Sequence, residues 1–269
     1  MTQGAYPRSV HKGASAEALK GIDVVILAGG LGTRIQPVLG SLPKVLAPIA
    51  EGTFLDILLV WLGSFGARRV IPCLGHGADQ VLAHLARHAP AGMEICPSVE
   101  PTPLGTGGAI RHAMPQLVSD PVLVMNGDTF LDADLGAFVN GHRSRKAALS
   151  LLCASVPSLA RFGAVDCDDQ GNVLSFMEKD PGRTGPGVIS AGIYLFSRLE
   201  LEALSRVGGP SLEEDFLRFR PPGHIHGEIC SGRFIDIGTP DSLRVASRII
   251  LGSEGEWTGT EEASQGTPS

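Results

Sequence analysis

Short apolar runs alternate with segments of helical periodicity over most of this chain. The runs are rich in Val, Ile and Leu and bounded by polar or glycine residues, which predicts strands at residues 24–27, 70–73, 122–125, 148–154 and 193–196. Apolar residues at helical spacing predict helices at 54–65, 78–88, 108–117 and 135–145. This alternation predicts an α/β fold, a single three-layer αβα domain with a Rossmann-like, mixed but mainly parallel sheet.

The pattern changes in the second half of the chain. Residues 162–180, FGAVDCDDQGNVLSFMEKD, predict two strands joined by a polar turn, and GPGVISAGIYLF predicts a further central strand. Ser211 opens SLEEDFLRFR as the expected cap of a helix with acids in its first turn. We expect one domain at 21–252 with a subregion at about 155–234, and disordered tails at 1–20 and 253–269.

The segment 24–44, VVILAGGLGTRIQPVLGSLPK, is the most informative part of the chain. A predicted strand ends in a loop whose glycines let backbone N–H groups approach a ligand, and Arg34 and Lys44 add positive charge. The pattern is neither a P-loop nor the GxGxxG fingerprint. It favours a phosphate-binding loop at the carboxyl end of the first strand, where α/β sheets bind ligands, although a glycine cluster alone is often a plain turn.

Acidic residues follow two other apolar runs. Asp128 comes just after the strand in VLVMNGDTFLD, and Asp236 follows a short run in FIDIGTP. Two such carboxylates can share one hard cation such as Mg²⁺. A second glycine-rich segment, SVEPTPLGTGGAIRHA, contains Glu100 and begins a predicted helix, whose N-terminal N–H groups suit a bound anion.

Composition narrows the possible functions. A net charge of −6 argues against general binding to nucleic acid, which needs clustered Lys and Arg. The sequence shows neither an apolar run of transmembrane length nor a signal peptide, so we expect a cytoplasmic protein without a membrane partner. The 5 cysteines are scattered and predict reduced thiols. His224 and His226 form an HxH pair for which packing is a better interpretation than metal binding.

Taken together, these segments resemble the signature of the sugar-1-phosphate nucleotidylyltransferases, or NDP-sugar pyrophosphorylases. LAGGLGTR followed by PK, PLGTGGA, NGD, FMEKD and FIDIGTP occur in the family's order over about residues 22–250, with Ile35 where the pattern usually has leucine. The resemblance implies the nucleotide-diphospho-sugar transferase fold. It also implies a reaction in which a sugar 1-phosphate and a nucleoside triphosphate give an NDP-sugar and pyrophosphate.

The resemblance further implies roles for individual residues. Arg34, Lys44, Asp128 and Lys179 are the implied catalytic residues, and Asp128 and Asp236 the implied Mg²⁺ ligands. The implied nucleotide contacts are Leu27, Ala28, Gly29, Gly30, Gly32, Thr33, Glu100, Leu104, Gly105, Thr106 and Gly107. The implied contacts to the sugar phosphate, within the subregion 155–234 and near Asp128, are Asn126, Gly127, Gly163, Glu178, Lys179, Gly192 and Glu213.

Within the family, the motifs look most like the branch that joins GTP to D-glycero-α-D-manno-heptose 1-phosphate for bacterial surface polysaccharide. Branches that use mannose 1-phosphate and GTP, or glucose 1-phosphate with UTP or dTTP, share most of these residues. A homodimer is a further expectation. Two other classes stay open: a catalytically silent nucleotide-sugar sensor, and a metal-dependent glycosyltransferase. The latter needs an Asp-x-Asp pair, and the pattern places Asp132 and Asp134 at the start of the next helix.

Overall fold

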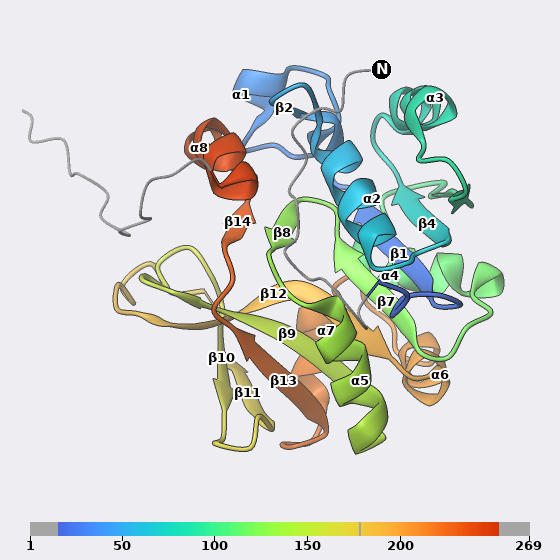
Figure 1. Cartoon of the computed structure of the whole chain (residues 1–269). Coiled ribbons are helices and arrows are strands. Elements are labelled where there is room, and N and C mark those ends of the chain that lie inside the picture. Colours follow the sequence, from blue (N-terminus) through green and yellow to red (C-terminus); the bar gives the residue numbers. More distant parts are fainter. Residues whose placement is uncertain (1–15, 178, 253–269) are drawn as a thin grey trace, which may run out of the picture.

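A large mixed sheet forms the centre of the molecule (Figure 1). The computed structural model describes residues 16–177 and 179–252. In that part of the chain the sheet has 10 strands, in the order β11-β10-β12-β7-β1-β4-β5, with β9 and β13 beyond β12 and β6 beside β4. Its strands are β1 (Asp23–Ala28), β4 (Arg69–Leu74), β5 (Glu94–Ile95), β6 (Ser98–Val99), β7 (Val122–Asn126), β9 (Leu149–Val156), β10 (Ala164–Cys167), β11 (Val173–Met177), β12 (Gly187–Phe196) and β13 (Ile225–Cys230).

Strand direction divides the sheet into two parts. β1 pairs in parallel with β4 and β7, and β4 pairs in parallel with β5 and β6. β12 runs antiparallel to its neighbours β7, β9 and β10, and β10 and β11 form the predicted hairpin. The expectation of a mixed sheet with a parallel centre is therefore confirmed, and the antiparallel strands lie in the second half of the chain.

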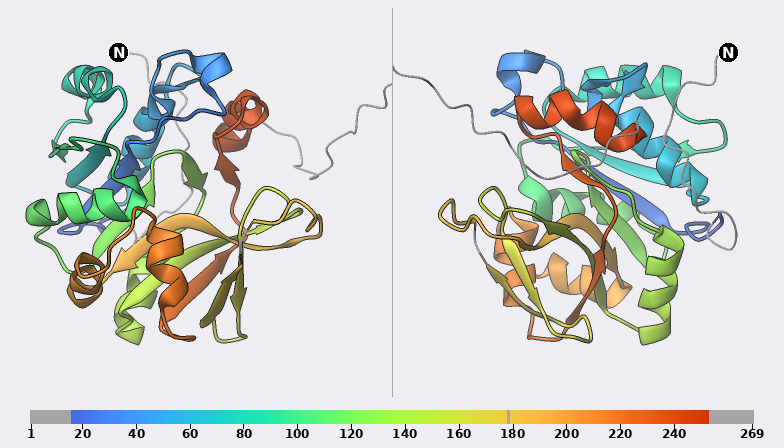
Figure 2. Two further views of the ribbon diagram at one scale, coloured as in Figure 1. Left: turned by 180° about the vertical axis from the view of Figure 1, so that it is seen from behind. Right: turned by 60° about the vertical axis from the view of Figure 1, so that its left-hand side comes forward.

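Helices cover both faces of the sheet. α2 (Phe54–Ser64), α3 (Ala78–His88), α5 (Leu135–Arg145) and α8 (Pro240–Leu251) contribute apolar side chains to one buried cluster. On the opposite face a second cluster includes side chains of α4 (Gly105–Ala113), α6 (Arg198–Ser205) and α7 (Leu212–Asp215), which lie together in the left view of Figure 2. The remaining elements are α1 (Gln36–Leu39), the strand pairs β2 (Pro48–Ile49) with β3 (Gly52–Thr53) and β8 (Thr129–Leu131) with β14 (Phe234–Asp236), and 3-10 turns at Lys44–Leu46, Met114–Gln116 and Leu217–Phe219.

Two expected boundaries are wrong. The helix predicted at 108–117 begins earlier, at Gly105, and ends at Ala113 before a 3-10 turn that contains Pro115. Proline lacks an amide hydrogen, so Pro115 cannot donate to the carbonyl four residues before it and the α-helical hydrogen bonds do not continue. The expected tail at 1–20 is also too long, because Leu19 is fully buried and its N–H donates to the carbonyl of Phe65. The rest of that tail and the tail at 253–269 lie outside the described residues.

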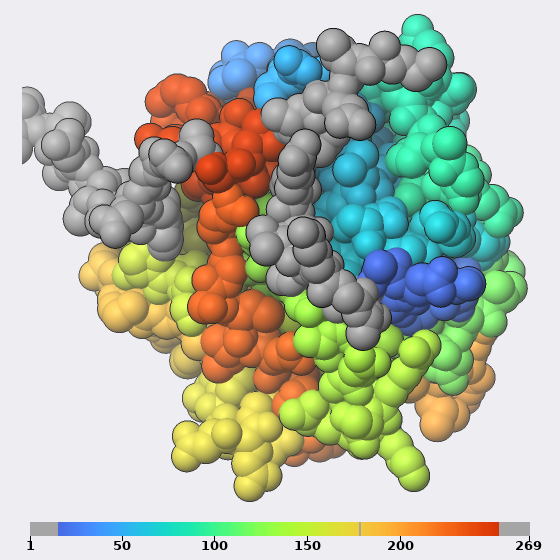
Figure 3. All heavy atoms as spheres, in the orientation of Figure 1, coloured from blue at the N-terminus to red at the C-terminus, as the bar shows by residue number. Residues whose placement is uncertain are grey.

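The C-terminal elements return to the N-terminal half. β14 pairs with β8 so that Asp236 lies opposite Thr129, and α8 follows directly. Figure 3 shows the orange and red residues of β13, β14 and α8 as one continuous band on this face of the molecule. Ala246 and Ile250 of α8 are fully buried in the cluster that α2 also joins. This return brings Asp236 to the edge of the sheet where β1 and β7 end.

Candidate active site

The loop after β1 lies open at the carboxyl edge of the sheet. Gly30, Thr33 and Arg34 are exposed, and Gly32 has a positive φ of 60°. Gly29 has no room for a side chain, because a Cβ there would lie 2.7 Å from Oε1 of Glu100. The structure therefore brings Glu100 against the loop, as the sequence predicted for two segments of one nucleotide site.

Lys44 and Asp128 form an ion pair across this edge. Nζ of Lys44 lies 2.6 Å from Oδ2 of Asp128, and the two side chains are 15% and 34% exposed. Lys44 starts the 3-10 turn after the loop, and Asp128 follows β7, which is the direct neighbour of β1. The carboxylate predicted at the end of β7 thus faces the lysine predicted to hold phosphate.

Asp236 lies next to Asp128. The backbone N–H of Ile237 donates to the carbonyl oxygen of Asp128 at 3.0 Å, and Arg34 approaches from the loop, because a Cβ at Gly238 would lie 3.3 Å from its Nη2. Burial, and then the negative charge of Asp128, raise the pKa of Asp236, although Lys44 lowers it. Two carboxylates that repel each other on one edge are a suitable donor set for a hard divalent cation.

A cavity of about 300 Å³ opens beside these carboxylates. Of the residues predicted to contact the sugar phosphate, several line it, namely Asn126, Gly163, Lys179 and Glu213. Asp128 and Asp236 line it as well, so the predicted cation site and the predicted sugar site are continuous. Glu178 lies outside the described residues, and its role stays a prediction.

Two predicted sugar-side glycines pack inside the fold and do not line the cavity. The N–H of Gly127 donates to the carbonyl of Leu27 at 2.8 Å, which joins the ends of β7 and β1. Gly192 has a φ of 70°, and a Cβ there would collide with the side chain of Asn126. Gly127 therefore joins the two strand ends and Gly192 makes room for Asn126, while their contacts to a sugar phosphate stay predictions.

Other lining residues were missed by the sequence analysis. Arg161 and Arg218 bring positive charge to the cavity, and aromatic walls come from Phe162, Phe176 and Phe234. Ser190 also lines it and lies within 3.0 Å of the hydroxyl of the buried Tyr194. Arg161 had one available signal, since it stands two residues before Gly163 in ARFGAV. Phe162 stands between Arg161 and Gly163 in the same segment, whereas the remaining lining residues come from strands and turns far apart in the sequence.

The segment at Leu104–Gly107 contacts both neighbouring parts of the site. Oε2 of Glu100 accepts from the N–H of Leu104 at 2.9 Å, so the acid that touches Gly29 also fixes the start of α4. On its other side, Oγ1 of Thr106 accepts from the N–H of Leu212 at 2.8 Å. Of the predicted nucleotide contacts, Leu27 and Ala28 end β1, whereas Leu104, Gly105, Thr106 and Gly107 lie at the start of α4, which packs against β1.

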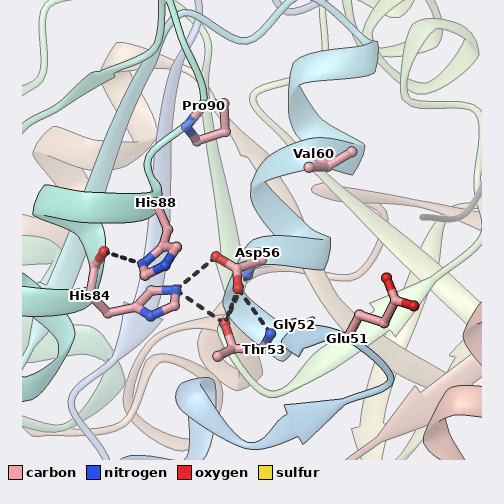
Figure 4. A pocket seen from close by; sticks show the side chains of 8 residues that line it. All are labelled: Glu51, Gly52, Thr53, Asp56, Val60, His84, His88 and Pro90. Atoms are coloured by element: carbon pink, nitrogen blue, oxygen red, sulfur yellow. Dashed lines mark hydrogen bonds and ion pairs between the residues drawn. The ribbon is translucent and has the colours of Figure 1, made fainter. Parts of the chain in front are cut away.

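A separate cavity of about 390 Å³ lies between the start of α2 and α3 (Figure 4). Nε2 of His84 lies 2.7 Å from Oδ1 of Asp56, and the ring of His84 stacks on His88 at 4.4 Å. Asp56 also accepts from the N–H and the hydroxyl of Thr53, which completes the N-terminal cap of α2. Because its polar groups are used in this cap, the cavity is best interpreted as part of the α2–α3 contact.

The remaining candidates have structural contacts. His224 lies 2.9 Å from Glu200, and the ring of His226 packs against Gly171. Asp134 caps α5 through the N–H groups of Gly136 and Ala137, as its position at a helix start predicted. Among the described residues, every helix is too short or too polar to cross a membrane.

Known proteins are similar to this chain over most of its length. A family model described as "Nucleotidyl transferase" matches residues 23–252. The chain is 34% identical to a D-glycero-α-D-manno-heptose 1-phosphate guanylyltransferase of Aneurinibacillus thermoaerophilus, over 84% of this chain and 97% of that protein. It is 32% identical to a mannose-1-phosphate guanylyltransferase of Mycobacterium tuberculosis, over 86% of this chain and 65% of that protein.

Solved structures agree with these sequence matches. The structure of HddC from Yersinia pseudotuberculosis complexed with GMP-PN matches with a TM-score of 0.75 and 32% identity, over 84% of this chain and 98% of that chain. A glucose-1-phosphate thymidylyltransferase, described as putative, from Bacillus anthracis matches with a TM-score of 0.70 at 21% identity, which supports the fold alone.

Proposed function

The chain belongs to the nucleotidyl transferase family, as a sugar-1-phosphate nucleotidyltransferase, and we propose that it joins GTP to D-glycero-α-D-manno-heptose 1-phosphate, giving GDP-heptose and pyrophosphate. The observation that carries the proposal is the arrangement of Lys44, Asp128 and Asp236 between the β1 loop and the sugar-side cavity. The choice of GTP and heptose is supported by the guanylyltransferases to which the chain is similar over nearly their whole length.

The proposed chemistry needs no protein nucleophile. An oxygen of the sugar 1-phosphate attacks the α-phosphorus of the nucleotide in line, the new P–O bond forms, and the bond to pyrophosphate breaks. Such a transfer is catalysed mainly by alignment and neutralisation of charge. The open loop with Arg34 would bind the β- and γ-phosphates, and Lys44 would hold the α-phosphate. Lys179, on the wall of the cavity, would position the incoming phosphate.

Asp128 and Asp236 would hold a divalent cation, for which we propose Mg²⁺. Their oxygens fit such an ion: burial and then the charge of Asp128 raise the pKa of Asp236, and a divalent cation would offset the repulsion between the two carboxylates. When bound, the ion supplies positive charge to the phosphate oxygens. In the described structure Lys44 neutralises Asp128, so nucleotide binding would draw Lys44 toward phosphate and leave Asp128 for the cation.

A panel of purified-enzyme assays tests the proposal. GTP, UTP, dTTP, CTP and ATP are each offered with heptose, mannose and glucose 1-phosphates, and pyrophosphate release is measured. We expect the highest kcat/KM for GTP with heptose 1-phosphate. A preference for UTP or dTTP would overturn the guanylyl assignment, and a preference for mannose 1-phosphate would favour the second guanylyltransferase branch, to which the chain is also similar.

Both rival classes make a different prediction. A silent nucleotide-sugar sensor or a glycosyltransferase would bind an NDP-sugar in calorimetry yet form no pyrophosphate from any pair. The Asp-x-Asp pair of the glycosyltransferase hypothesis is engaged elsewhere, since Asp132 pairs with Arg233 at 2.6 Å and Asp134 caps α5. The single-domain division, a homodimer and a cytoplasmic location stay proposals.

A further inference from the structure

The segment before α7 is attached to the first turns of α4. Residues 209–212 precede Glu213, which lines the sugar-side cavity. Three hydrogen bonds join the segment to α4, namely Leu212 N to Thr106 Oγ1 at 2.8 Å, Gly107 N to Pro210 O at 2.8 Å and Arg111 Nη2 to Gly209 O at 2.5 Å. The segment that leads directly to the carboxylate of Glu213 is therefore fixed to α4, a helix that the sequence assigns to the nucleotide.

Two glycines of PLGTGGA, Gly105 and Gly107, lie against this segment. A Cβ at Gly105 would lie 2.5 Å from the carbonyl oxygen of Pro210, and Gly105 also has a φ of 73°. A Cβ at Gly107 would lie 3.3 Å from the backbone nitrogen of Leu212. Both positions thus have a structural reason to be glycine that does not involve a bound nucleotide.

Glu213 is held from two directions. The preceding residue, Leu212, is 1% exposed, and its N–H is bound by Thr106. The carboxylate of Glu213 accepts from the hydroxyl of Tyr194 at 2.8 Å. The backbone of this segment is therefore positioned by α4, while the side chain is positioned by β12.

We propose that Thr106 is a positioning residue for the sugar side of the active site, acting through Leu212 on Glu213. The resemblance to known sequences assigns Thr106 only to the nucleotide. The inference rests on the proposed function, because it takes the cavity lined by Glu213 as the sugar site. It implies that the base-side segment and the sugar-side carboxylate form one rigid unit, so a change at residue 106 reaches the sugar.

The test is a pair of substitutions at this position. Thr106→Val keeps the shape of the side chain but cannot accept from the N–H of Leu212, whereas Thr106→Ser keeps the hydroxyl. The matched control is Thr102→Val, the same change at an exposed threonine of the same loop. Each variant is assayed with whichever nucleotide and sugar 1-phosphate the wild type uses best, so the result does not depend on the base or the sugar.

We expect Thr106→Val to raise the KM for the sugar 1-phosphate about ten-fold, the effect of an unmade hydrogen bond at a buried N–H. The KM for the nucleotide rises by less, since valine keeps the shape of the threonine side chain at a position that the resemblance also assigns to the nucleotide. Thr106→Ser restores the sugar KM, and Thr102→Val leaves both values unchanged. A rise in the nucleotide KM alone would overturn the proposal, as would an equal rise in both values with a lower Tm.

Failure of the proposed function gives a different result. If the wild type turns over no combination of nucleotide and sugar 1-phosphate, the proposed function is wrong. Calorimetric titrations with a sugar 1-phosphate and with GTP then compare the effect of Thr106→Val on the Kd of each ligand. Weaker sugar-phosphate binding by Thr106→Val with unchanged GTP binding would still support the positioning role. A wild-type protein that binds no sugar phosphate would overturn both proposals.

Discussion

The hydroxyl of Tyr194 donates a hydrogen bond to Oε1 of Glu213 at 2.8 Å, from a ring that is 1% exposed. Burial and then the charge of Glu213 raise the pKa of Tyr194 well above its usual value, so the phenol keeps its proton at all ordinary pH values. The same hydroxyl lies 3.0 Å from Oγ of Ser190, which in turn accepts from the N–H of Gly192. This chain of polar contacts links the bend of β12 to the wall of the cavity.

Tyr194→Phe removes the hydroxyl that donates to Glu213 and that also lies within hydrogen-bond distance of Ser190. A neutral donor to a carboxylate contributes about 1.5–3 kcal/mol, so we expect the KM for the sugar 1-phosphate to rise by about ten-fold or more. Steady-state kinetics with each substrate varied in turn measures the effect, and the nucleotide KM is the internal control. An unchanged sugar KM would mean that Glu213 does not contact the sugar.

Asp128→Ala removes one proposed cation ligand and leaves Lys44 without its ion-pair partner. We expect kcat to fall by at least about 10²–10³-fold, the scale for loss of one preorganised charge in a transition state. We expect Arg34→Ala to lower kcat on the same scale, because Arg34 is the residue proposed to bind the β- and γ-phosphates. Since Arg34 is exposed, its loss should leave the core intact. Pyrophosphate release is the measurement, with circular dichroism to confirm folding. Near-normal release by either variant removes that residue from the mechanism.

Asp236→Asn should separate stability from activity. The pKa of Asp236 is raised by burial and by Asp128, so its ionised form is disfavoured in the folded protein at neutral pH. The neutral amide removes that repulsion and can still accept from the N–H of Gly238. We expect a higher Tm together with a loss of turnover of at least about 10²-fold. Asp169→Asn, in an exposed turn, is the control and should change neither. A lower Tm for Asp236→Asn would contradict the proposed repulsion.

Asp23 provides a pH-dependent contribution to stability. Burial raises the pKa of Asp23. The N–H groups of Val118 and Ser119 and the ion pair with Arg69 together lower it by more, so the pKa lies below its usual 3.8. A carboxyl group whose pKa is lower in the folded state than in the unfolded state stabilises the fold at any pH above its unfolded-state pKa. This stabilisation is lost as the pH falls through the folded-state pKa. We expect Asp23→Asn to cost about 2–3 kcal/mol at neutral pH.

Urea unfolding of the wild type and Asp23→Asn at several pH values measures this contribution. The difference in unfolding free energy should be constant from about pH 7 to about pH 5 and shrink below the usual carboxyl pKa of about 3.8. A difference that stays constant to lower pH would mean that the ionised form of Asp23 is not what stabilises the fold.

The sequence by itself determined which segments form strands and helices and which functional residues follow each strand at the edge of the sheet. Apolar runs that end in glycine or aspartate set β1 with its loop and β7 with Asp128, because strand formation and turn chemistry depend on neighbouring residues. The same local signals located the β10–β11 hairpin and the cap of α7 at Ser211.

Only the tertiary structure decided which distant residues meet. Asp236 faces Asp128 because β14 pairs with β8, and Thr106 holds Leu212 because residues 209–212 pack on α4. Arg161 and Arg218, which are far apart in the sequence, line the same cavity only in the folded chain. Such contacts depend on strand register and on how helices cover the two faces, which no local pattern specifies. The tertiary structure also gave individual glycines their neighbours: Gly29 lies against Glu100, Gly127 donates to the carbonyl of Leu27, and Gly192 lies against Asn126.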